Sequence, residues 1–158
     1  MNENFRPPYF PMMIDIKDKN ILVIGGGHVA LRRTETLLKC GAKVKVISKD
    51  FIFDFPDEAE KINREFVPED ITEEFEFVVA ATNDKKINNL IARISHSKKI
   101  SVNVCDNKNE CDFFFPSLIN YKNIAVSVCS AGLSKKLTKK LSDKLRKVWH
   151  SWIQEENK

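Results

Sequence analysis

The segment with the clearest chemical meaning is a glycine-rich turn, Gly25-Gly26-Gly27-His28-Val29-Ala30. Its residues match the pattern G-x-G-x-x-A. The apolar run 20–24 before it predicts a strand, and the helical periodicity after it predicts a helix, which is the context that this pattern has in dinucleotide-binding sites. In this arrangement Gly25 permits a tight turn, Gly27 lets a phosphate approach the backbone, and Ala30 allows the helix to pack closely on the strand. Free N–H groups at a helix start also attract anions. The turn predicts a site for the pyrophosphate of a dinucleotide, with a purely structural glycine turn as the alternative.

The end of the second predicted strand holds the residues that would meet the adenosine side of such a cofactor. Dinucleotide sites usually carry an Asp or Glu about 20 residues after the glycine turn, where it binds the ribose 2′-hydroxyl. Here Asp50 stands slightly late, and the adjacent Lys49 would tolerate a 2′-phosphate. These two residues leave the choice between NAD and NADP open.

Polar residues also follow two later strands of the predicted sheet. Thr82 and Asn83 come after the run 76–81, so they are expected to line the nicotinamide side of the crevice. Helix capping by Asn83 or Asp84 is the simpler interpretation. Asp106 follows the next strand and would lie at the mouth of the same crevice, where a carboxylate can act as a general base. Aspartates are common in turns, so position alone leaves both roles open for Asp106.

The cysteine and histidine residues do not form a metal-binding pattern. Cys105 and Cys111 lie close in sequence beside two aspartates, but there is no CxxC pair and no histidine at ligand spacing. The four cysteines lack the spacing of a disulfide framework, which favours reduced thiols in a cytosol. We therefore expect no metal site.

Strand-like runs alternate with helical periodicity over the first two-thirds of the chain. The predicted strands are 20–24, 43–47, 65–67, 76–81 and 100–104, and the predicted helices between them are 28–40 and 84–97. Such alternation with short connections is typical of βαβ units. We predict an α/β fold, a Rossmann-like doubly wound parallel sheet, with a dinucleotide-binding domain over residues 1–112.

The alternation stops after residue 112. Two apolar runs, 113–119 and 123–129, have no helix between them and predict a small β-pair. Ser134 is expected to cap a helix that ends near residue 154. An apolar stripe follows one face of that helix: Leu137, Leu141, Leu145, Val148 and Trp152. Because this stripe needs cover, we expect residues 113–158 to form a dimerisation region in which a second subunit covers it.

Charge and composition narrow the classes of function. The chain carries a net charge of +4, but residues 1–132 hold 18 basic and 19 acidic residues, whereas 133–158 hold 8 and 3. The basic end could attract nucleic acid, a membrane surface or a polycarboxylate substrate, or it could simply be a solvated helix face. No apolar run approaches the ~20 residues of a membrane span, and residues 1–8 lack a signal-peptide pattern. We expect a cytoplasmic protein without membrane or nucleic-acid partners.

Several motifs in order resemble one known family. They are 9–16 (YFPMMIDI), 23–33 (VIGGGHVALRR), 80–84 (AATND), 102–106 (VNVCD), 111–117 (CDFFFPS) and 126–134 (VSVCSAGLS). Together they resemble precorrin-2 dehydrogenase, which also forms the N-terminal module of bacterial siroheme synthase, and the likeness extends from about residue 9 to residue 145. This combination is much more specific than the glycine turn alone.

The resemblance implies NAD-dependent oxidation of precorrin-2 to sirohydrochlorin on the path to siroheme, and in some members also insertion of ferrous iron. It implies a catalytic role for Asp106, cofactor binding by Gly25, Gly27, His28 and Val29, and an adenosine side at Lys49 and Asp50. It further implies a homodimer whose later segment binds the tetrapyrrole, for which we single out Ser130, Lys135 and Lys136.

This sequence departs from the family pattern near its end. The usual proline before the last helix is replaced by Lys135, most of the further helical portion of longer members is absent, and no methyltransferase module is expected. These departures put iron insertion in doubt more than dehydrogenation.

Two other classes of function compete with the dehydrogenase. A regulatory module that only senses NAD(H) would explain the glycine turn and the helix stripe, but not the motifs 103–106 and 111–117. A basic helix that binds nucleic acid or membrane on a Rossmann scaffold would explain only the charge.

Overall fold

The computed structural model describes residues 9–122 and 124–156, which fall into two compact units. One unit is Met12–Phe113, and the other combines the described residues up to Pro11 with those from Phe114 onward. Residues 1–8, where a signal peptide was judged absent, lie outside the described part of the chain.

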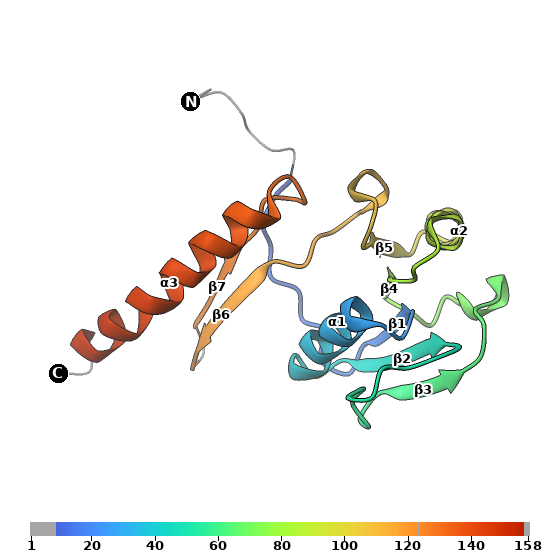
Figure 1. Cartoon of the computed structure of the whole chain (residues 1–158), viewed down its shortest axis with the longest axis horizontal. Helices are drawn as coiled ribbons and strands as arrows, with labels where there is room; N and C mark the ends of the chain where they lie inside the picture. Colours follow the sequence, from blue (N-terminus) through green and yellow to red (C-terminus); the bar gives the residue numbers. More distant parts are fainter. Residues whose placement is uncertain (1–8, 123, 157–158) are drawn as a thin grey trace. The chain divides into compact units, whose positions relative to one another are not determined.

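The first unit is built on a parallel sheet of five strands (Figure 1). The strands are β1 (Asn20–Ile24), β2 (Lys43–Ser48), β3 (Glu60–Asn63), β4 (Phe77–Ala80) and β5 (Ser101–Val104). Their order is β3-β2-β1-β4-β5, so the chain leaves β1 in one direction to β2 and crosses back to β4. The crevice at such a reversal, beside the carboxyl ends of β1 and β4, is where open α/β sheets bind ligands.

Two helices cover the sheet. Helix α1 (His28–Lys39) packs against β1 and β2, and helix α2 (Lys85–Ser97) packs against β4 and β5. Two short 3₁₀ turns, η1 (Pro68–Asp70) and η2 (Lys108–Glu110), lie in the connections.

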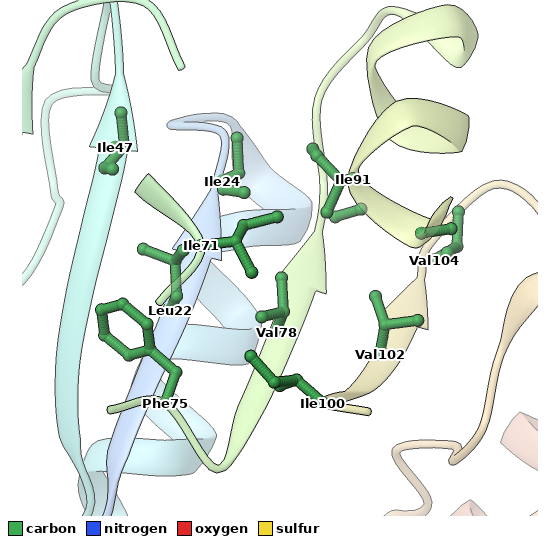
Figure 2. Close-up of a cluster of buried hydrophobic side chains, with 12 residues drawn as sticks. Leu22, Ile24, Ile47, Ile71, Phe75, Val78, Ile91, Ile100, Val102 and Val104 are labelled. Atoms are coloured by element: carbon green, nitrogen blue, oxygen red, sulfur yellow. The ribbon is translucent and has the colours of Figure 1, made fainter. Parts of the chain in front are cut away.

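The core explains why the strands read as continuous apolar runs. Figure 2 shows the cluster on the face covered by α2, where Leu22, Val78 and Val102 from adjacent strands lie side by side beneath Ile91. Helix α1 lies behind the sheet in that view, so both faces are covered and both sets of alternating side chains are apolar. The expected doubly wound α/β fold is confirmed.

One predicted strand was wrong. The third strand is Glu60–Asn63, whereas 65–67 is not a strand. β3 pairs only with β2 and places a single partly buried apolar side chain, Ile62, against the core, so it has little apolar signal. The more apolar Phe66 and Val67 precede Pro68, which opens the η1 turn.

The second unit consists of a hairpin and a long helix. Strands β6 (Ser117–Tyr121) and β7 (Ile124–Val128) pair antiparallel, and α3 (Lys135–Glu156) packs on them. Arg146 ties the two together, donating to Ser117 Oγ at 3.0 Å and to the Leu118 carbonyl at 3.4 Å. The expected β-pair followed by a capped helix is confirmed, and Ser134 Oγ accepts from Leu137 N at 3.3 Å.

The apolar stripe of α3 is largely exposed in this chain. Leu137, Leu141, Val148 and Trp152 are between 40% and 53% exposed. By contrast, Ser142 is fully buried although it is polar. Among the described helices, none is long and apolar enough to cross a bilayer.

Candidate functional site

The first glycine of the turn is required by the neighbouring strand. Gly25 has φ +123°, and a Cβ on it would lie 2.4 Å from the Ala81 carbonyl oxygen, just past β4. Its N–H donates to the Ile47 carbonyl at 2.9 Å, which joins the turn to β2 as well. A side chain here would meet both a strained backbone and a backbone atom that cannot move away.

Gly26 is equally constrained, which the sequence analysis missed by treating it as a variable position. A Cβ on Gly26 would lie 2.1 Å from the Asp50 carbonyl oxygen and 2.8 Å from Ser48 Oγ. The Gly26 carbonyl accepts from Ile52 N at 3.0 Å, so the segment after β2 lies directly on the turn. Nothing in the local sequence signals this contact, because Ile52 comes from a separate segment.

Gly27 differs from the other two because the space beside it is open. A Cβ on Gly27 would meet nothing within 4 Å. Gly27 is the N-cap of α1, with no side-chain cap and no acidic residue in the first turn. The following His28 and Val29 are exposed. The first N–H groups of α1 therefore have no capping side chain, and this is the environment that an anionic phosphate group needs.

The end of β2 places Lys49 and Asp50 beside the turn, and both are exposed. Lys49 Nζ lies 2.5 Å from Glu65 Oε1, and the hydrogen bond to Glu65 raises the pKa of Lys49. The contact of the Asp50 carbonyl with Gly26 brings Asp50 close to the glycine turn. Lys49 is thus paired with a carboxylate, and Asp50 lies where an acidic residue of a dinucleotide site is expected.

The end of β4 is held by side chains of α2. Thr82 N and Thr82 Oγ1 donate to Asn88 Oδ1 at 3.1 and 2.7 Å. Asp84 caps α2, accepting from Lys86 N at 2.7 Å, so of the two predicted caps the structure uses Asp84. Asn83 is exposed. Thr82 therefore makes hydrogen bonds within the chain, whereas Asn83 is exposed to solvent.

The end of β5 brings Asp106 next to β4. Asp106 is exposed, and its Oδ1 accepts from Asn88 Nδ2 at 2.9 Å. Asn88 is fully buried, although the analysis of the sequence did not single it out. A signal was present: Asn88 and Ser95 are polar, yet they are buried on the same helix as Ile91.

Two thiols and an arginine lie near the end of β5. Burial raises the pKa of Cys105 and of Cys111, which favours their neutral forms at pH 7. Arg33 lies beside Cys105, and burial lowers the pKa of Arg33. Cys111 Sγ accepts from Val104 N at 3.2 Å, and Cys111 also packs against the hydrophobic core. Among the described residues, no group of three or more His, Cys, Asp or Glu side chains could hold a metal ion.

The three predicted substrate-binding residues belong to the second unit. Ser130 Oγ accepts from Ser134 N at 3.0 Å and from Thr138 Oγ1 at 2.9 Å. Lys135 and Lys136 are exposed at the start of α3. The structure thus brings the predicted cofactor residues and Asp106 together within Met12–Phe113, while these three residues lie in the other unit.

The chain is similar to proteins of known family. Residues 12–117 match the family described as "Putative NAD(P)-binding". The chain is 34% identical over 142 residues to the siroheme synthase of Actinobacillus pleuropneumoniae, covering 87% of this chain and 29% of that protein. It is 36% identical over 142 residues to the siroheme synthase of Zymomonas mobilis, again covering 87% of this chain and 30% of the relative. The chain thus spans about a third or less of these curated relatives.

A solved structure has the same fold. It is that of "SirC, precorrin-2 dehydrogenase", with a TM-score of 0.75 and 23% sequence identity, covering 87% of this chain and 69% of that one. At this identity the likeness concerns the fold, and it extends over most of both chains.

Proposed function

The chain belongs to the NAD(P)-binding family, and from this premise we propose that it is an NAD-dependent precorrin-2 dehydrogenase that forms sirohydrochlorin for siroheme synthesis. The observation that carries the proposal is the grouping of the glycine turn and Asp106 at one edge of one sheet. The substrate in this proposal is indicated by the names of the relatives, siroheme synthase and precorrin-2 dehydrogenase. In this proposal residues 1–112 bind the cofactor, and residues 113–158 dimerise and bind the substrate.

The residues of the first unit fit the cofactor. The open space at Gly27 and the uncapped start of α1 suit the pyrophosphate, which Gly25, His28 and Val29 would flank. Asp50 would accept hydrogen bonds from the ribose hydroxyls. Lys49 is already paired with Glu65, so it is less free to bind a 2′-phosphate, which favours NAD over NADP.

The nicotinamide side completes the cofactor site. Thr82 and Asn83, at the end of β4, would lie beside the nicotinamide ring. When bound, NAD accepts a hydride from the substrate.

Asp106 supplies the other half of the oxidation. Removal of two hydrogens from the macrocycle requires that a proton leave in addition to the hydride, and an exposed carboxylate at the crevice edge can receive it. Its Oδ1 accepts a hydrogen bond from Asn88, and the residue is exposed. In this mechanism Asp106 is the catalytic residue.

The charge of the second unit suits a substrate with many carboxylates. Precorrin-2 carries eight of them, and residues 133–158 have a net charge of +5. Lys135 and Lys136 would attract and orient these groups, with Ser130 as a hydrogen-bonding partner. The presence of four free cysteines agrees with a cytoplasmic location, where thiols stay reduced.

We expect the purified chain to convert precorrin-2 to sirohydrochlorin with stoichiometric reduction of NAD, measured anaerobically by absorbance. A parallel reaction with added ferrous iron tests iron insertion separately. NAD binding without any turnover would refute the dehydrogenase and favour the NAD(H)-sensing module. Retention on heparin would not decide between these functions, because it reports only the basic charge.

We also propose a homodimer formed through residues 113–154, because the α3 stripe is exposed in the single chain. Replacing both Leu137 and Leu141 by glutamine should weaken the dimer at least tenfold, since two apolar side chains of the buried interface become polar. Sedimentation over a range of concentrations measures this.

The matched control for the dimer replaces Lys140 and Lys147 by glutamine. These residues lie on another side of α3 by helical spacing, and both are exposed. The control should sediment as the wild type does. A wild-type chain that sediments as a monomer at micromolar concentration would contradict the dimer.

A further inference from the structure

Asn88 is an unusual residue for the place it occupies. It lies one turn into α2, it is 0% exposed, and its neighbours on the buried side of the helix include Ile91 and Ala92. A polar side chain in such a position is costly unless its hydrogen bonds are made. Its partners therefore show what it does.

All four hydrogen-bonding positions of the Asn88 amide are used. Oδ1 accepts from Thr82 N at 3.1 Å and from Thr82 Oγ1 at 2.7 Å. Nδ2 donates to the Thr82 carbonyl at 3.1 Å and to Asp106 Oδ1 at 2.9 Å. An amide has two donor hydrogens and two acceptor lone pairs, so nothing is left over.

This network permits only one orientation of the amide. Its NH₂ group faces two acceptor oxygens, the Thr82 carbonyl and Asp106 Oδ1. Its oxygen faces two donors on Thr82. Reversing the amide would place oxygen against oxygen and lose these bonds, so the donor to Asp106 is fixed in direction by the other three contacts.

The backbone places this donor where two strand ends meet. Asn88 N donates to the Asp84 carbonyl at 2.9 Å in the capped first turn of α2, directly after β4. Asp106 lies in the turn after β5, where Cys105 N donates to the Ala80 carbonyl at 3.0 Å. Asn88 is thus a rigid link from the end of β4 to a carboxylate that is otherwise exposed.

We propose that Asn88 is a positioning residue that holds the Asp106 carboxylate in the orientation needed to receive the substrate proton. A loop aspartate without this contact would sample several rotamers, and misorientation of a general base lowers turnover more than it lowers substrate affinity. The inference rests on the proposed function, because it assigns Asn88 a role through Asp106.

The experiment is a double-mutant cycle on the full chain, with anaerobic turnover of precorrin-2, NAD affinity and thermal unfolding as readouts. Asn88→Ala should lower kcat about five- to tenfold and change the KM for precorrin-2 and the Kd for NAD by less than about twofold. In the Asp106→Asn background, Asn88→Ala should have no further effect on kcat, because the group it positions is already lost. A merely structural role would multiply the two losses instead.

Asn89→Ala is the matched control, since Asn89 is the adjacent residue of the same type and is exposed. It should leave kcat unchanged. If Asn88→Ala does not fold, Asn88→Ser takes its place, because serine keeps a polar group at this position while its shorter side chain does not reach Asp106. It should lower kcat to a similar extent and show the same absence of effect in the Asp106→Asn background.

The outcomes separate this inference from the proposed function. An inactive wild-type chain would overturn the dehydrogenase and the role of Asn88 with it. An active wild type would overturn the Asn88 inference alone in any of three cases: the two losses multiply, Asn88→Ala matches Asn89→Ala, or NAD affinity falls in parallel with kcat.

Discussion

Replacing Asp106 by asparagine should lower turnover of precorrin-2 by about 10²–10⁴-fold, because the variant cannot receive a proton. Asparagine has nearly the same shape as aspartate, and the glycine turn follows β1 whereas Asp106 follows β5. NAD affinity should therefore change little. Steady-state turnover and NAD titration measure the two effects separately. A loss confined to kcat identifies Asp106 as the general base.

The control for Asp106→Asn removes a negative charge nearby without touching the proposed base. Glu110→Gln does this in the η2 turn of the same loop, and it should leave turnover within about threefold, or less than ~0.7 kcal/mol. If Asp106 only closes a turn, asparagine would serve almost as well, and turnover at the wild-type rate would contradict the catalytic role. Loss of iron insertion with intact dehydrogenation would also contradict it and assign Asp106 to metal handling.

Replacing Gly27 by aspartate should lower NAD affinity at least tenfold, or about 1.4 kcal/mol. The new side chain would place volume and negative charge where the pyrophosphate is proposed to lie. The fold should be kept, because a Cβ at Gly27 meets nothing within 4 Å and the residue has an ordinary backbone conformation with φ −88°. Calorimetric titration with NAD and thermal unfolding measure affinity and stability.

Gly25→Ala is the informative counterpart, because it should show the opposite pattern. Its Cβ would collide with the Ala81 carbonyl and its φ of +123° is unfavourable for alanine, so the free energy of unfolding should fall by about 1–3 kcal/mol or more. Gly27→Ala should keep the wild-type stability and weaken NAD binding less than aspartate does. Unchanged NAD affinity in Gly27→Asp would remove the glycine turn from the cofactor site.

The fold class could be predicted from the amino-acid sequence, because the patterns that indicate it are local. Continuous apolar runs such as Ile21–Ile24 signal strands buried on both faces, and the helical period after Gly27 signals the crossover that parallel strands need. The glycine turn between them predicted the dinucleotide site, and Ser134 correctly predicted the start of α3. The edge strand β3 was not predicted from the sequence, because a strand with one neighbour needs little apolar surface, and Ile62 supplies nearly all of it.

The contacts between residues of the site could not be predicted from the sequence and became visible in the folded chain. Gly26 is constrained by Asp50, and Asp106 is held by Asn88, across separations that no local pattern encodes. Hydrogen bonds and close contacts between strand ends depend on strand order, and the order β3-β2-β1-β4-β5 is a property of the whole sheet. The sequence could place Asp106 at the edge of the sheet, but the buried amide that orients it became visible only when α2 was packed against β4 and β5.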